Sequence, residues 1–181
     1  RRWESTLDLQ RCDLASLQDA VDRVVSSGIR IMSASSFAAD RHDWRTELHR
    51  LYAEVETDVP AAFPVRAVSF EDFEAMVLGR RFNADGFFVA LDGEQLIGLT
   101  EPQPVDDVPK AILQNLTGVR SDYRGRGIAT ALKSRAAIWA VQAGYTSIRT
   151  QNAESNASML AVNDRLGFQR DRATIEYLKR L

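Results

Sequence analysis

The chain has 181 residues, of which 45% are hydrophobic and 27% are charged, and this indicates one soluble globular domain with its own core. The formal net charge of -2 and the lack of a Lys/Arg-rich run argue against a nucleic-acid-binding surface. The single cysteine, Cys12, excludes an internal disulfide and a cysteine zinc cluster. No apolar run has the length of a membrane span and no signal peptide is visible, so we expect a cytoplasmic protein without a metal or a membrane partner.

Hydrophobic spacing predicts the elements of the first half of the chain. Asp92-Gly93, between two apolar runs, is the strongest local signal and predicts a hairpin. Ser69 has the sequence context of a helix N-cap. The expected elements are strands over 3–9 and 29–32, helices over 14–25 and 44–55, a helix after Ser69, and the hairpin strands 87–91 and 95–99.

The second half is predicted to alternate strands and helices around a glycine-rich loop. The expected elements are strands over 111–119, 147–151 and 173–179, and helices over 128–143 and 156–166. Two strands that flank a helix, preceded by an antiparallel hairpin, predict an α/β fold with a sheet of mixed direction.

The loop from Arg124 to Ala129 lies between a predicted strand and a predicted helix. A helix start carries unsatisfied N–H groups and a positive dipole end, and a glycine-rich turn before it lets an anion approach the backbone. Arg124 and Arg126 add positive charge, and Thr130 adds a hydroxyl. The pattern therefore predicts a phosphate or pyrophosphate site, although a tight turn with two surface arginines is an equal alternative at this point.

The loop and its surroundings resemble the GNAT family of acyl-CoA-dependent N-acyltransferases. Arg124-x-x-Gly127-x-Ala129 fits the family signature Q/R-x-x-G-x-G/A. Leu116-Thr117-Gly118-Val119 before the loop and Leu166-Gly167-Phe168 after it stand in the order that the family shows. The resemblance implies the GNAT fold, a mixed and mostly antiparallel sheet whose central strands splay apart, with helices on both faces.

The resemblance also implies that acetyl-CoA is the co-substrate. The backbone of the loop would bind its pyrophosphate, and the strand before the loop would pair with its pantetheine arm. The N–H of Val119 would polarise the thioester carbonyl as an oxyanion donor. The expected cofactor-binding residues are Thr117, Gly118, Val119, Arg124, Gly125, Arg126, Gly127, Ile128, Ala129, Thr130, Asn152, Asn156 and Asn163.

Asn163 is a departure from the family pattern. Many members have a tyrosine at this position, four residues before the glycine of Gly-Phe, and use it as a general acid towards the leaving thiolate. An amide cannot act as an acid at neutral pH, although it can form a hydrogen bond to the CoA sulfur or pantetheine. This departure leaves two alternatives: an N-acetyltransferase that forms a ternary complex, and an inactive acyl-CoA-binding module.

Transfer to an amine requires a general base, because the attacking nitrogen must lose a proton. Glu54 and Glu101 are the candidates, one at the end of a predicted helix and the other after a predicted strand. The resemblance places the end of this helix, with Glu54, Glu56 and Asp58, at the acceptor side. Acidic residues there would suit a cationic amine, either a small molecule or a peptide or protein amine. His42 and His49 lack a third ligand at metal spacing and are expected to lie on the surface.

The resemblance divides the chain at residue 28. Residues 29–181 correspond to a GNAT acetyltransferase domain, and residues 1–28 form a strand-helix extension before it. This extension is either the remnant of an upstream copy in a tandem GNAT protein or a segment that covers the sheet or contacts a second subunit. We expect a monomer or a homodimer.

Overall fold

The computed structural model describes residues 1–39, 41–60, 66–106 and 108–175, and its centre is one seven-stranded sheet. The strands lie in the order β2-β3-β4-β5-β6-β1-β7. Their bounds are β1 Arg2–Asp8, β2 Ile29–Ser33, β3 Phe88–Asp92, β4 Gln95–Pro104, β5 Ala111–Val119, β6 Ser147–Ala153 and β7 Gln169–Thr174. The sheet confirms the predicted mixed direction, since β5 and β6 are parallel and every other neighbouring pair is antiparallel.

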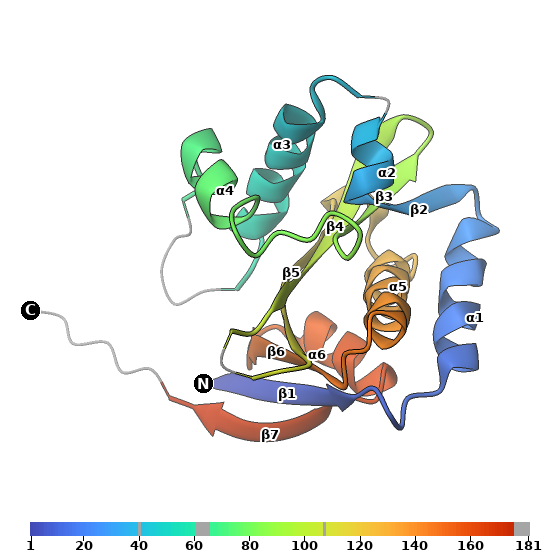
Figure 1. Cartoon of the computed structure of the whole chain (residues 1–181), viewed down its shortest axis with the longest axis vertical. Helices are drawn as coiled ribbons and strands as arrows, with labels where there is room; N and C mark the ends of the chain where they lie inside the picture. The colour runs from blue at the N-terminus through green and yellow to red at the C-terminus, as the bar shows by residue number, and fades with distance from the viewer. Residues whose placement is uncertain (40, 61–65, 107, 176–181) are drawn as a thin grey trace, which may run out of the picture.

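Helices cover both faces of the sheet, as expected (Figure 1). Helices α1 (Leu14–Val25) and α5 (Ile128–Gln142) pack on one face, with apolar clusters between them and the strands. Helices α2 (Ala34–Ala39), α3 (Trp44–Thr57) and α4 (Phe70–Met76) form the other layer. Helix α6 (Ala157–Arg165) connects β6 to β7. No helix of the described residues is both long enough and apolar enough to cross a membrane.

The two central strands separate halfway along their length. β5 and β6 pair through three positions, Ala111, Ile112 and Leu113, with residues 147–149 opposite them. Beyond Leu113 no further pairing joins the two strands, while β5 stays paired with β4 as far as Val119. The Gln114 carbonyl oxygen still accepts a hydrogen bond from Thr150 Oγ1 of β6 at 3.0 Å. Beyond Gln114 the edge of β5 that faces β6 is open, and this is the splay that the resemblance implied.

Residues 1–28 add one strand to this sheet and one helix to its face. β1 lies between β6 and β7 and pairs with both, and Leu7 is buried in the core that α1 and α5 share. α1 then crosses the same face as α5 (Figure 1). The origin of this segment in an upstream copy stays a prediction.

The predicted elements differ from the structure mainly in four places. The strand predicted over 95–99 continues to Pro104 as β4, so Glu101 lies within this strand and not after it. The short helix α2 was not predicted. The hairpin between β3 and β4 turns at Gly93 and Glu94, since Asp92 still pairs with Gln95. The last strand was predicted over 173–179, whereas β7 begins at Gln169 and ends at Thr174, and positions 176–179 lie outside the described residues.

Candidate functional site

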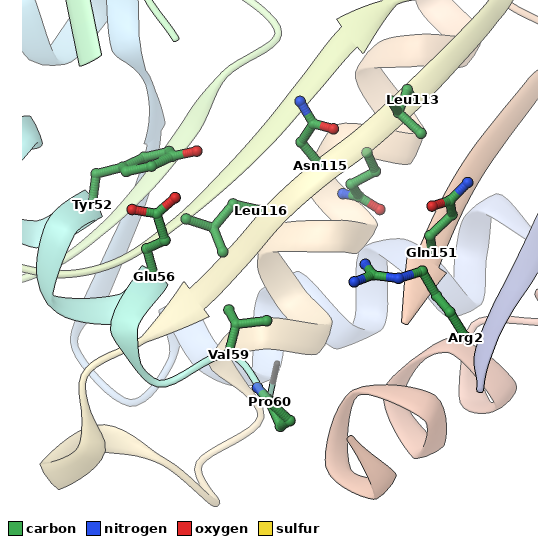
Figure 2. A pocket seen from close by; sticks show the side chains of 10 residues that line it. Arg2, Tyr52, Glu56, Val59, Pro60, Leu113, Asn115, Leu116 and Gln151 are labelled. Atoms are coloured by element: carbon green, nitrogen blue, oxygen red, sulfur yellow. The ribbon is translucent and has the colours of Figure 1, made fainter. Parts of the chain in front are cut away.

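A cavity of about 370 Å³ opens where β5 and β6 separate. β5, β6 and β1 form one side of it, and the end of α3 with the residues that follow forms the other (Figure 2). Its lining residues are Arg2, Tyr52, Glu56, Val59, Pro60, Leu113, Gln114, Asn115, Leu116 and Gln151. The volume is within the range of small-ligand sites, so the fold itself provides a site at the splay.

Glu101 lies directly behind this cavity. A β-bulge places it on β4 opposite two residues of β5, Asn115 and Leu116, both of which line the cavity. Glu101 is only 2% exposed. Its carboxylate accepts hydrogen bonds from the Tyr52 hydroxyl at 3.0 Å and from Gln103 Nε2 at 2.6 Å.

Burial raises the pKa of Glu101 to about 7, even though its hydrogen bonds oppose the shift. A carboxyl group with this pKa exchanges its proton near neutral pH, which suits a general base. Burial and the nearby Glu101 carboxylate both raise the pKa of Tyr52. Tyr52 therefore remains a hydrogen-bond donor to Glu101.

The structure separates the two predicted base candidates. Glu54 lies outside the cavity lining and pairs with Arg120, with 3.5 Å between Glu54 Oε1 and Arg120 Nε. Glu56, two residues further along α3, turns its carboxylate into the cavity (Figure 2). Burial raises the pKa of Glu56 as well. Neither candidate lines the cavity itself, but Glu101 lies directly behind two lining residues, and the role of either carboxylate as the base stays a prediction.

The glycine-rich loop has the conformation expected of an anion-binding turn. Gly125 and Gly127 have φ angles of 77° and 81°, which a residue with a side chain adopts only with strain. Gly127 is the N-cap of α5, and no side chain of the described residues caps this helix. The first N–H groups of α5, from Ile128 to Thr130, are therefore available to a ligand.

The arginines of this region already have partners within the chain. Arg124 pairs with Asp58 at the end of α3 and donates from Nε to the Val119 carbonyl at 3.2 Å. Arg126 lies over the Tyr123 ring, 4.8 Å from its centroid. Because both arginines have partners, we expect the N–H groups at the start of α5 to contribute most to anion binding.

The strand before the loop offers its open edge rather than its side chains. The hydroxyl groups of Thr117 and Thr100 lie 2.7 Å apart in a hydrogen bond between β5 and β4. A Cβ atom at Gly118 would lie 2.5 Å from Val55 of α3, so this glycine permits the close approach of helix and strand. The expected roles of Thr117, Gly118 and Val119 in binding pantetheine, and of Val119 as oxyanion donor, stay predictions.

The three asparagines have different positions. Asn163 donates from Nδ2 to Asn152 Oδ1 at 2.7 Å, which joins α6 to β6. The Oδ1 atom of Asn163 is buried and has no hydrogen-bond partner among the described residues. Asn156 caps α6 by accepting from Met159 N. Thr130 lies apart from them and lines a second cavity of about 810 Å³ between α1 and β7.

Sequence reasoning placed Glu56 at the acceptor side only as one of three acidic residues, and it did not single out Tyr52 or Arg2. Tyr52 and Glu56 are one helical turn apart, a spacing that places them on the same face of α3. This spacing could have been noticed, whereas Arg2 is brought in by β1 and no local pattern predicts it. His49, expected on the surface, is half-buried, with Nε2 2.8 Å from the Val68 carbonyl oxygen.

Comparisons with known proteins agree with this geometry. A model of the acetyltransferase (GNAT) family matches residues 42–168. N-acetyltransferase 8F1 of Rattus norvegicus is 33% identical over 92 residues, which are 49% of this chain and 42% of that protein. The chain thus spans less than half the length of this relative. No group of three or more metal-binding side chains occurs in the described parts of the chain.

Solved structures show the same fold. A GCN5-related N-acetyltransferase from Sphaerobacter thermophilus matches with a TM-score of 0.68 and 17% identity, over 94% of this chain and 48% of that one. A tandem GNAT protein from the clavulanic acid biosynthesis pathway matches with a TM-score of 0.64 and 26% identity, over 93% of this chain and 50% of that one. These matches confirm the predicted architecture.

Proposed function

Because the chain belongs to the acetyltransferase (GNAT) family, we propose that it transfers the acetyl group of acetyl-CoA to an amine, with Glu101 as the general base. The observation that carries the proposal is the buried carboxylate of Glu101, with its pKa raised to about 7, directly behind the cavity at the splay. The volume of about 370 Å³ favours a small acceptor or a single amine side chain over a large rigid one.

The residues divide the reaction between them. The start of α5 would hold the pyrophosphate of acetyl-CoA, and the open edge of β5 would align its pantetheine arm, so that the thioester lies in the cavity. The amine nitrogen attacks the thioester carbonyl, the C–S bond breaks, and CoA leaves as its thiolate. The Tyr52 hydroxyl passes the amine proton to Glu101, to which it is hydrogen-bonded at 3.0 Å.

Asn163 does not prevent this reaction, because a thiolate can leave without an acid. Its pair with Asn152 fixes its side chain at the junction of α6 and β6. Its unpaired Oδ1 offers an acceptor for an amide N–H of pantetheine. We therefore propose a binding role for Asn163.

The proposal can be tested in two steps. The first is a thermal shift with CoA for the parent chain and for Gly127→Val, whose side chain would strain the turn and block the approach of phosphate. We expect CoA to stabilise the parent and not the variant. The second step measures CoA thiol release with DTNB over a panel of amines. Stabilisation by CoA without turnover on any amine would reject catalysis, and no stabilisation would reject the CoA site.

A further inference from the structure

Two residues that line the cavity each have one buried oxygen atom without a hydrogen-bond partner among the described residues. One is Glu56 Oε2, at the end of α3, and the other is Gln114 Oε1, on β5. Gln114 is 1% exposed, and its Nε2 donates to Thr100 Oγ1 at 2.9 Å, which leaves Oε1 as the unpaired end. Figure 2 shows the Glu56 carboxylate directed into the cavity, towards the β5 side.

Both unpaired atoms are hydrogen-bond acceptors, and this selects the ligand that would satisfy them. A buried acceptor without a donor is destabilising, and a buried carboxylate without a countercharge is more so. An ammonium group supplies three donors, a positive charge and no acceptor. The chemistry of these two lining residues, one on each side of the cavity, therefore matches an alkylammonium group.

In the proposed reaction, the amine that reacts is not the partner of Glu56. That amine must lose its positive charge before it attacks, and Glu101 with Tyr52 removes its proton. Glu101 accepts hydrogen bonds from Tyr52 and Gln103, so its carboxylate is already well supplied with donors. The Glu56 carboxylate accepts one hydrogen bond, from the backbone of Val68, and its Oε2 atom has no donor among the described residues, so it can still accept from a cation.

We propose that the acceptor is a small aliphatic diamine or polyamine, and that Glu56 and Gln114 bind its second ammonium group while the first amine is acetylated. This inference rests on the proposed acetyl transfer. Glu56 would then determine specificity, whereas Glu101 would act as the general base. Burial raises the pKa of Glu56, and a bound ammonium would lower that pKa again.

The other end of the cavity favours a different acceptor, one that carries a carboxylate. Arg2 and Gln151 line it from β1 and β6 (Figure 2). An acceptor with a carboxylate in place of the second amine would be drawn to the Arg2 guanidinium and repelled by Glu56. Three acceptors of equal chain length therefore separate the alternatives: butylamine with one amine, putrescine with two, and γ-aminobutyrate with an amine and a carboxylate.

The experiment measures kcat/KM for the three acceptors with the parent chain, Glu56→Gln and Asp19→Asn. Asp19 is an exposed carboxylate on α1, on the opposite face of the sheet, and controls for loss of one negative charge. We expect the parent to prefer putrescine over butylamine by at least about tenfold, as for a buried charge pair. This ratio should fall towards one in Glu56→Gln, mainly through KM, and remain in Asp19→Asn.

A binding measurement tests the diamine site even if no acceptor is turned over. Calorimetric titration of putrescine into the protein with CoA should give binding that Glu56→Gln weakens at least about tenfold. Turnover or binding without preference for putrescine over butylamine would overturn the diamine assignment and leave acetyl transfer intact. A preference for γ-aminobutyrate would overturn it in favour of the Arg2 end. Putrescine binding that depends on Glu56 without turnover would support a diamine site at Glu56 and reject acetyl transfer.

Discussion

The fold buries the Glu101 carboxylate where its charged form is poorly solvated. Its pKa of about 7 arises mainly from burial, and its hydrogen bonds only partly offset that effect. As a base it acts when ionised, so kcat should rise as the pH rises through about 7. We expect Glu101→Gln to lower kcat by about 100-fold or more and to remove this limb from the pH profile of kcat.

The effect of Glu101 on stability provides a check that the Glu101→Gln variant is folded. The folded-state pKa of Glu101 lies above its usual 4.5, so its contribution to stability is present below 4.5 and is lost as the pH rises through about 7. Glu101→Gln should therefore be at least as resistant to heat as the parent above pH 7. A variant that keeps the limb near pH 7 would contradict the assignment of Glu101 as the base, and an unfolded variant would contradict the expected effect on stability.

Lys133 is a second buried ionisable residue, and the proposed reaction does not use it. It is 2% exposed on α5, and burial lowers its pKa from 10.5 to about 7. Its Nζ lies 4.8 Å from the centroid of the Phe168 ring. Between these two pKa values the unfolded chain binds more protons than the folded chain, so this residue makes stability increase as the pH rises from about 7 towards 10.5.

Lys133→Met should remove this penalty, because methionine has a similar length and no charge. We expect the variant to be more stable at pH 7 by roughly 2–4 kcal/mol, a shift of several degrees in Tm for a chain of this size. The gain over the parent should shrink as the pH rises towards 10. Thermal melts between pH 6 and 10 measure both effects. A lower Tm at every pH would show that the ammonium stabilises the fold.

At the scale of elements, the approach of α3 to β5 sets the width of the cavity. A Cβ atom at Gly118 would lie 2.5 Å from Val55, on the turn of α3 between Tyr52 and Glu56. Gly118→Ala should push α3 away and cost about 2–3 kcal/mol, as other overpacked sites do. Gly98→Ala on the neighbouring strand is the matched control, because its nearest contact, Leu132 Cδ1, is at 3.1 Å.

Urea unfolding compares the two variants directly. We expect Gly118→Ala to lose the larger share of stability and to raise the KM of the amine, because both Tyr52 and Glu56 move with α3. If both variants lost the same free energy of unfolding, α3 would be able to move away from β5 at little cost. The helix would then not control the width of the cavity.

The elements that the sequence predicted well are those with a clear apolar period. The spacing of Leu48, Leu51 and Val55 predicted α3, and the structure buries all three. β7 has no such signal, because all six of its residues are exposed and five of them are polar or charged, as suits the edge of a sheet. Within the site, Glu101 and the loop could be predicted from neighbouring sequence. Arg2 and Gln151 could not, because long-range strand pairing brings them together.

At the scale of the whole molecule, the N-terminal strand holds the C-terminal part of the sheet in place. β1 pairs with β6 at seven positions and separates it from β7. Among the described strands, β7 pairs only with β1. β6 is one wall of the cavity, so the first residues of the chain support a site whose other residues follow much later in the sequence.

A proline at the centre of β1 should reveal this dependence. Ser5 is 1% exposed and stands opposite Thr150 of β6 and Arg170 of β7. Ser5→Pro removes a backbone donor from an internal strand, so we expect a loss of about 3 kcal/mol or more in unfolding by urea. Hydrogen exchange should speed up over β7 and β6, and CoA affinity should fall with it.

Ser5→Ala is the matched control for that experiment. The Ser5 hydroxyl is buried without a hydrogen-bond partner among the described residues, so its removal should be neutral or slightly stabilising. If Ser5→Pro left exchange in β7 and CoA affinity at the level of Ser5→Ala, β1 would be dispensable to the sheet. Faster exchange in β7 with unchanged CoA affinity would instead confine its influence to the sheet edge and leave the cavity wall independent of it.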